Sequence, residues 1–314
     1  MLEAAERQGF TLEYSCRTGR CSTCRAQVAS GSTKELAPEV GLTEGECAEG
    51  WILTCVRAAT SDVVLSVDSE LDAAMAPVRT VPCRIRSIER LSGDVLEVVL
   101  RIPPTVSWDF RAGQHMEIQG PLGVRRSYSM ANANAEDDIR IHVREVAQGV
   151  FSRYWFSQAA PGDLLRFRGP LGTFFLRGRE QSQLVFLATG TGIAPVIAML
   201  EDLASREPGR AVVVYFGGRN RSDLYWSPAA WWPDGWQFKP VLSRPDAGWT
   251  GRVGYVQNAM LADGVDLSVS EIYATGSDAM VHSVRTLLAD LGHSPQEFHA
   301  DAFVSSAPTK VSAT

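Results

Sequence analysis

The stretch from Glu13 to Ala26 reads EYSCRTGRCSTCRA and places Cys16, Cys21 and Cys24 within nine residues. A fourth cysteine, Cys55, follows after thirty intervening residues in GWILTCV. Clustered cysteines in a reducing compartment typically hold a metal or carry out redox chemistry rather than form a disulfide framework. The other two cysteines, Cys47 and Cys83, do not fit this spacing, so we expect them to be ordinary buried or surface residues.

The spacing Cys-x4-Cys-x2-Cys with a distant fourth cysteine is the plant-type pattern of a 2Fe-2S cluster. Two irons need two thiolates each, and one loop can reach both only if its backbone amides also face the cluster sulfurs. Gly19, Ser22 and Thr23 keep large side chains out of this space. Zinc usually takes two separated pairs of ligands, so a zinc site is a weaker alternative. Reduced surface thiols without a metal are the other alternative.

Residues 1–75 resemble a plant-type ferredoxin domain, which implies a β-grasp fold with the four cysteines as iron ligands. The family usually has Gly at the position of Ser22, so we expect a slightly displaced loop. The family also begins with a β-hairpin, whereas MLEAAERQGFTLEYSC already has the character of the following helix and the entry to the cluster loop. We therefore expect the first hairpin to be missing, through truncation or an upstream start, which leaves an open sheet edge.

Composition is that of an ordinary globular protein, with 314 residues, 45% apolar and 21% charged. The length suggests two or three domains. A net charge of −6 argues against a nucleic-acid partner. No apolar run approaches the length of a transmembrane helix, and the acidic, amphipathic start does not have the pattern of a signal peptide. We therefore expect a cytoplasmic protein.

Two further domains are predicted after a linker over residues 66–82, which is rich in small residues and proline. Short alternating segments such as CRIRSIERL and VLEVVLRIP indicate an antiparallel barrel over residues 79–178. Repeated strand, turn and helix patterns, beginning with QLVFLATGTGIAPVIAMLEDLAS, indicate a parallel α/β domain over residues 179–305. Five tryptophans between 225 and 249 are expected mostly to cover one side of this domain.

Two segments of the predicted barrel resemble the flavin site of the ferredoxin-reductase superfamily, namely RSYS at 126–129 and GVFS at 149–152. The resemblance implies that Arg126 pairs with a flavin phosphate, that Tyr128 lies flat on the isoalloxazine, and that Ser129 hydrogen-bonds near N5. A helix N-terminus at GVFS suits the FAD diphosphate and favours FAD over FMN. The alternative for RSYS is an ordinary strand without a ligand. The alternative for GVFS is that Ser152 only caps the helix N-terminus. The expected flavin contacts are Arg126, Ser127, Tyr128, Ser129, His142, Val143, Gly149, Val150, Phe151 and Ser152.

Four segments of the α/β domain resemble the nucleotide site of the same superfamily: TGTGIAP, FGGRNRSD, YATGSDAM and FHADAF. The expected nucleotide contacts are Gly190, Thr191, Gly192, Pro195, Gly218, Arg219, Arg221, Gly276, Asp278 and Met280, and Phe303 is expected to pack near the flavin. Thr275 replaces a usual cysteine beside the hydride-transfer position, and with Tyr128 and Ser129 it forms the expected catalytic set. Solvated surface remains the alternative for Arg219, Arg221 and Asp223, as core packing does for Phe303. We favour NADH, while NADPH remains possible.

The order of these domains implies a path from NAD(P)H to FAD, then to the 2Fe-2S cluster, and then to a partner protein. The first hypothesis is the reductase component of a multicomponent, ring-hydroxylating oxygenase. The second is the reductase of a CDP-4-keto-6-deoxyglucose 3-dehydrase system in dideoxysugar synthesis. The third is a non-catalytic binding module with a structural zinc, which requires three motifs to be coincidental.

Overall fold

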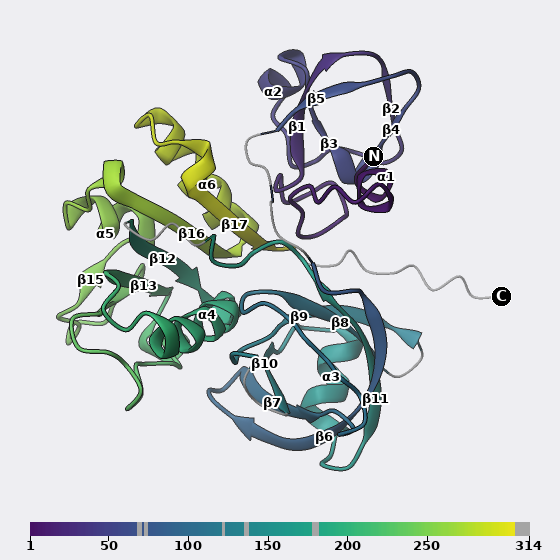
Figure 1. Cartoon of the computed structure of the whole chain (residues 1–314). Helices are drawn as coiled ribbons and strands as arrows, with labels where there is room; N and C mark the ends of the chain where they lie inside the picture. Colours follow the sequence, from purple (N-terminus) through teal and green to yellow (C-terminus); the bar gives the residue numbers. More distant parts are fainter. Residues whose placement is uncertain (68–70, 72–74, 121–122, 135–137, 178–181, 305–314) are drawn as a thin grey trace.

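The computed structural model describes residues 1–314 apart from 68–70, 72–74, 121–122, 135–137, 178–181 and 305–314. Three units follow one another along the chain (Figure 1). We call them the N-terminal domain (residues 1–67), the barrel (79–177) and the α/β domain (182–304). This order of a ferredoxin-like domain, an antiparallel barrel and a parallel α/β domain confirms the predicted fold class.

The N-terminal domain begins with helix α1 (Leu2–Arg7), followed directly by the cysteine loop, as expected. Its core is small and includes Leu2, Tyr14, Leu53 and Val56. The sheet has the order β3-β1-β5, so β5 pairs only with β1 among the described residues. The elements are β1 (Arg25–Ser30), β2 (Thr33–Glu35), α2 (Glu44–Ala48), β3 (Trp51–Leu53), η1 (Thr54–Val56), β4 (Arg57–Ala59) and β5 (Val64–Ser66).

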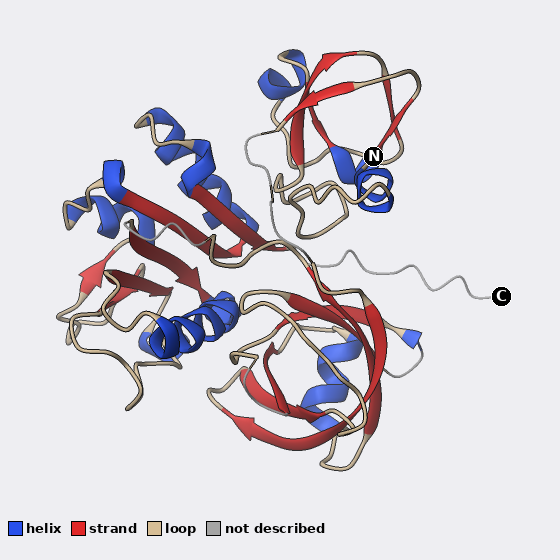
Figure 2. Cartoon of the chain, viewed as in Figure 1, coloured by secondary structure: helices blue, strands red, loops and turns tan. Residues whose placement is uncertain are grey.

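The barrel is a six-stranded antiparallel sheet of order β10-β7-β6-β11-β8-β9, closed by a bridge between Met130 and Ile141 (Figure 2). Alternate residues of β6, namely Val81, Cys83 and Ile85, are buried, as the period of two predicts. The predicted linker ends too late, because β6 already begins at Arg79. The elements are β6 (Arg79–Arg90), β7 (Val95–Arg101), β8 (His115–Gln119), β9 (Arg125–Ser129), β10 (Asp138–Arg144), α3 (Val150–Ser157) and β11 (Leu164–Leu171).

The α/β domain has a parallel sheet of order β15-β14-β13-β12-β16-β17. Helix α4 packs on one face, and α5 and α6 pack on the other, so two apolar clusters flank the sheet. Trp226, Trp231, Trp232 and Trp236 belong to the α4 side, which confirms their predicted covering role. The elements are β12 (Gln183–Thr189), η3 (Gly190–Gly192), α4 (Ile193–Arg206), β13 (Val212–Gly218), η4 (Arg221–Asp223), β14 (Gln237–Leu242), β15 (Arg252–Val253), α5 (Val256–Ala262), η5 (Leu267–Val269), β16 (Ser270–Ser277), α6 (Asp278–Asp290), η6 (Pro295–Glu297) and β17 (Phe298–Phe303).

Strand β10 joins the barrel to the α/β domain through every second side chain, Arg140, His142 and Arg144. Successive residues of a strand face opposite sides, so these three share one face. They contact Glu201 on α4 at 2.6 Å, the Tyr225 hydroxyl at 3.0 Å and Asp223 at 3.6 Å, in that order. One polar face of a single strand therefore supplies three of the contacts that hold the two domains together.

No helix in the described part of the chain has the length and apolarity needed to cross a bilayer.

The two cysteines outside the predicted cluster site differ sharply in environment. Cys83 is 2% exposed in the barrel core, and burial raises the pKa of its thiol to about 12, whereas Cys47 is exposed on α2. Because the thiolate is the reactive form, we expect iodoacetamide to modify native Cys47 and to leave Cys83 intact until the chain unfolds. Mass spectrometry of modified peptides checks this, with Cys47→Ser and Cys83→Ser as controls. Rapid modification of Cys83 in the folded protein would contradict the barrel packing.

Candidate redox site at the domain junction

The four cysteines of the predicted cluster site come together as two pairs at one end of the N-terminal domain. The Cys21 thiol donates a hydrogen bond to the Cys16 sulfur, which lowers the pKa of Cys16 to about 5. Cys24 is paired with Cys55 in the same way, and this hydrogen bond lowers the pKa of Cys55. The pKa of Cys21 and that of Cys24 are raised, because each is a buried donor.

The backbone of the cysteine loop turns its amides toward the sulfurs. The amide of Cys16 donates to the Cys21 sulfur, and the amide of Thr18 donates to the Cys16 sulfur, both at 3.4 Å. Gly19 has a φ of +74°, and a Cβ there would lie 2.5 Å from the Pro38 carbonyl oxygen, so the loop requires glycine at this position.

Ser22 stands in the left-handed region with a φ of +59°, where the related domains usually have glycine. This conformation costs an ordinary residue about 1–2 kcal/mol. The Ser22 hydroxyl donates to the Gly41 carbonyl oxygen, which offsets part of that cost. Ser22 therefore adopts a left-handed backbone conformation, and the expected displacement of the loop stays a prediction.

The four sulfurs fit an iron–sulfur cluster better than a single ion. They form two pairs, and backbone amides face two of the sulfurs, as a cluster with bridging sulfides requires. Over the described ranges, no three His, Cys, Asp or Glu side chains are grouped as ligands of one metal ion. Cys16, Cys21, Cys24 and Cys55 would hold the cluster.

The predicted flavin strand is β9, and its side chains already have partners in the protein. The Tyr128 hydroxyl accepts a hydrogen bond from the Trp155 indole at 2.9 Å, and its ring packs edge-on against Phe151. Arg126 donates to the neighbouring Arg125 carbonyl oxygen. Ser127 is exposed and Ser129 is buried. The flavin roles of Arg126, Ser127, Tyr128 and Ser129 stay predictions.

Helix α3 supplies the predicted diphosphate site. Gly149 is its N-cap and no side chain caps the first turn, so the amides that begin with Val150 suit an anion. The alternative role of Ser152 as an N-cap is wrong, because its hydroxyl instead bonds both the amide and the carbonyl oxygen of Val146. The Phe151 side chain is 3% exposed in the barrel core, so only its backbone is placed for a ligand.

Two predicted flavin contacts on β10 have different surroundings. The side chain of His142 is buried between the Tyr225 hydroxyl and the Glu97 carboxylate, with its Nε2 3.6 Å from the nearer Glu97 oxygen. Val143 faces the barrel core. The side chains of both residues are thus used by the protein, which leaves their backbone as the part that suits a cofactor.

The two predicted nucleotide turns lie against each other. A Cβ on Gly192 would lie 2.6–2.7 Å from the backbone of Thr275 and Gly276, so the turn after β12 and the turn after β16 are in contact. Gly190 has a φ of +57°, and Thr191 lies beside it in η3. Pro195 is buried within the first turns of α4. This close backbone approach suits a dinucleotide, because side chains are excluded.

Thr275 is fully buried, and its hydroxyl has no hydrogen-bond partner among the described residues. Such a group is a candidate for pairing with a ligand, since an unpaired buried hydroxyl costs free energy. Asp278 lies in the first turn of α6, and Met280 packs beside the cysteine loop. Phe303 is half-buried opposite Ser277 in the sheet register. The nucleotide roles of Thr275, Asp278 and Met280, and the place of Phe303 near the flavin, stay predictions.

The predicted ribose loop follows Gly218 at the end of β13. Asp223 accepts the amides of Arg219 and Asn220 at 2.8 and 3.1 Å, so its carboxylate stabilises the loop. Arg221 forms an ion pair with Asp246 at 2.7 Å and lies over the Trp249 ring.

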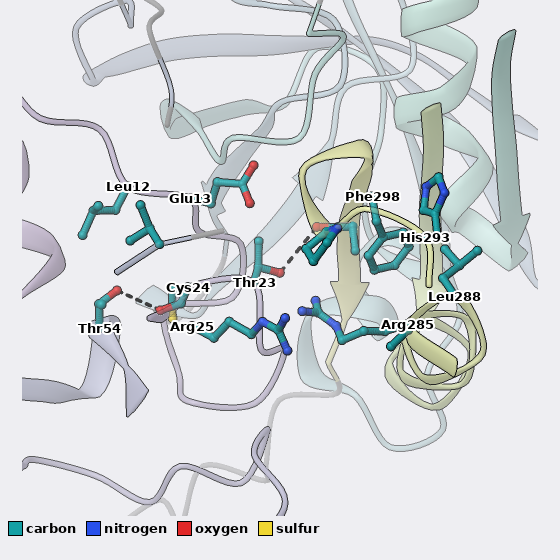
Figure 3. A pocket seen from close by; sticks show the side chains of 14 residues that line it. Leu12, Glu13, Thr23, Cys24, Arg25, Thr54, Arg285, Leu288, His293 and Phe298 are labelled. Carbon is teal, nitrogen blue, oxygen red and sulfur yellow. Dashed lines mark hydrogen bonds between the residues drawn. The ribbon is translucent and has the colours of Figure 1, made fainter. Parts of the chain in front are cut away.

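Several contacts between the N-terminal domain and the other two were not predicted. Ser15 donates to Asp301 on β17, and Glu13 pairs with Arg177 between the barrel and the α/β domain. A pocket opens along the same seam, where the Thr23 hydroxyl reaches the Ala300 carbonyl oxygen at 3.4 Å (Figure 3). These partners are more than 150 residues apart in the sequence, so no local pattern indicated them.

Replacing Thr275 by valine tests whether its hydroxyl is unpaired. We expect Thr275→Val to raise the free energy of unfolding of the nucleotide-free protein by about 1 kcal/mol, because a buried polar group without a partner is removed. The control is Thr173→Val, whose equally buried hydroxyl bonds the backbone of Tyr14 and whose loss should destabilise by about 1–2 kcal/mol. Urea unfolding measures both, and equal destabilisation by the two variants would show that Thr275 has a partner.

Comparison with known proteins agrees with this geometry. Residues 1–60 match the family described as a 2Fe-2S iron-sulfur cluster binding domain, 82–176 an oxidoreductase FAD-binding domain and 186–286 an oxidoreductase NAD-binding domain. The chain is 39% identical over 310 residues to the CDP-6-deoxy-L-threo-D-glycero-4-hexulose-3-dehydrase reductase of Yersinia pestis, covering 98% of this chain and 93% of that one.

It is 33% identical to reductase component 2 of a terephthalate 1,2-dioxygenase from Comamonas, covering 97% of this chain and 92% of that one. Among solved structures, a cytochrome P450 reductase of Amycolatopsis superposes with a TM-score of 0.79 at 30% identity, covering 98% of this chain and 94% of that one. The chain is thus an oxidoreductase that uses NAD(P)H, FAD and a 2Fe-2S cluster. It belongs to the ferredoxin-reductase superfamily, in the group that joins an N-terminal plant-type 2Fe-2S domain to FAD- and NAD(P)H-binding domains.

Proposed function

We propose that this chain is the reductase of a dehydrase that acts on a CDP-linked 4-keto-6-deoxy sugar, and that it takes its electrons from NADH. The observation that carries the choice of acceptor is the 39% identity to the Yersinia dehydrase reductase, against 33% to the Comamonas dioxygenase component. FAD, when bound, would supply the exchange between the two-electron chemistry of NADH and the one-electron chemistry of the cluster. A cytoplasmic location is part of this proposal.

The protein's own contribution is to position these groups. The contact between Gly192 and the backbone of Thr275 and Gly276 forms the nucleotide turn beside the barrel. The uncapped N-terminus of α3 offers amides to the FAD diphosphate. Cys16 and Cys21 pack against β17, which is hydrogen-bonded to the strand that ends at this turn. This arrangement supports electron transfer between a nucleotide, a flavin and a cluster bound at neighbouring sites.

The choice of NADH rests on the ribose loop. Arg221 is engaged by Asp246 and Trp249, and Asp223 is engaged by backbone amides of its own loop. A 2′-phosphate would have to compete with Asp246 for the Arg221 guanidinium. We therefore propose that NADPH is used less efficiently than NADH.

A ring-hydroxylating or other oxygenase is the second candidate acceptor. It is supported by the Comamonas component and by the superposition on the Amycolatopsis P450 reductase over nearly the whole chain. The test supplies NADH and the purified reductase to a sugar dehydrase and to a terminal oxygenase at equal concentrations. Product formation by the dehydrase at about ten times the oxygenase rate or more supports the proposal, and the reverse preference would overturn it.

Removing one cluster ligand should separate the two halves of the electron path. In Cys55→Ser, we expect NADH to reduce ferricyanide through the flavin at nearly the normal rate, while cytochrome c reduction falls by about a hundredfold or more. Cys47→Ser is the matched control, because this exposed cysteine lies outside the cluster site, and both activities should persist. Loss of ferricyanide reduction in Cys55→Ser would show that the domains do not act separately.

A further inference from the structure

The segment that leads into the first cluster ligand is held by both reductase domains. The Tyr14 amide donates to the Thr173 hydroxyl at 2.9 Å, and the Thr173 hydroxyl donates back to the Tyr14 carbonyl oxygen at 3.1 Å. The next residue, Ser15, donates to Oδ1 of Asp301 on β17 at 2.5 Å. Cys16 follows immediately, so these contacts fix the backbone from which the first ligand projects.

The Ser15 contact is the one that reaches the nucleotide turn. Asp301 lies opposite Thr275 in the register of β17 and β16. Its neighbours Ala300 and Ala302 pack with Cys21, Cys16 and Met280 in one apolar cluster. The hydrogen bond therefore joins the residue before a cluster ligand to the residue beside the Thr275–Gly276 turn, across a domain boundary.

Because the hydrogen bond between Ser15 and Asp301 is buried, it favours one arrangement of the domains over others. Ser15 is 7% exposed and Asp301 is 4% exposed, so water does not compete freely for either group. A carboxylate or carboxyl buried without its partner is costly, because the desolvation of that group is then uncompensated. Shifting the N-terminal domain along β17 would leave Asp301 in this state.

We propose that Ser15 and Asp301 are positioning residues for the internal electron transfer, whose hydrogen bond holds the cluster loop at a fixed place relative to the flavin and nucleotide turn. Neither residue touches the reacting atoms. The stoichiometry of the reaction is unchanged: one hydride from NADH supplies two electrons, and a 2Fe-2S cluster held by the four cysteines would take one electron at a time.

The central variant is Ser15→Ala, examined in the full-length holoenzyme. In anaerobic stopped-flow with NADH, we expect the cluster-bleaching phase to slow by about tenfold or more, because a small misplacement of a donor and an acceptor strongly lowers a rate. The flavin-bleaching phase, which reports hydride transfer, should stay within about twofold of normal. The matched control is Ser205→Ala, which removes a serine hydroxyl bonded to the Asp202 carbonyl oxygen on the exposed side of α4.

A second measurement does not depend on activity. Hydrogen–deuterium exchange in the amides of β17 and of the segment leading to Cys16 should be faster in Ser15→Ala, since the seam is held less tightly. The electron paramagnetic resonance spectrum of the chemically reduced cluster should match that of the normal protein. A changed spectrum would mean that Ser15 acts on the cluster itself, and the positioning role would be rejected.

Asp301→Asn separates the contact from the charge. The amide oxygen still accepts from the Ser15 hydroxyl, so we expect a cluster-bleaching rate close to normal. A rate as slow as that of Ser15→Ala would show that the negative charge matters rather than the hydrogen bond, and would overturn the proposal. Unchanged bleaching and exchange in Ser15→Ala would overturn it equally.

Discussion

The arrangement of the whole molecule depends on a short run of chain, Glu13 to Cys16, being bonded by side chains from two other domains at once. Glu13 pairs with Arg177, whose guanidinium also lies 3.5 Å from His299, and His299 bonds the buried Glu271 at 2.9 Å. Burying ionisable groups costs free energy that only a complete set of partners offsets. The network therefore favours one placement of the cysteine loop over displaced ones.

The contacts of Glu13 to Cys16 form one joint between domains. The second joint, between the barrel and the α/β domain, has a different set of contacts. Arg140, His142 and Arg144 on β10 reach across it by ion pairs and a hydrogen bond, beside an apolar contact in which Ala112 and Phe174 join the core on the α4 side of the sheet. Polar contacts of this kind are directional, so they fix an orientation more than they add affinity. One joint thus holds the cysteine loop, while the other holds the barrel against the α/β domain.

Local patterns made much of this structure predictable. The cysteine spacing, the period of two in β6 and the glycines of the TGTG turn each depend on a few neighbouring residues, and the fold class follows from them. The features that were not predicted depend on contacts between residues far apart in the chain, such as Ser15 with Asp301 and Arg140 with Glu201. No local sequence pattern around either partner indicates such a contact. The alternative role of Ser152 as an N-cap is wrong for a local reason, because helix α3 begins two residues before it and its hydroxyl bonds the preceding turn.

The position of β17 at the end of its sheet has a consequence beyond electron flow. Its backbone pairs with β16 on one side, and on the other the Thr23 hydroxyl and the cysteine loop cover it. An uncovered terminal strand is a template on which other polypeptides can add. The cysteine loop therefore occupies part of an edge whose backbone groups would otherwise be open to such pairing.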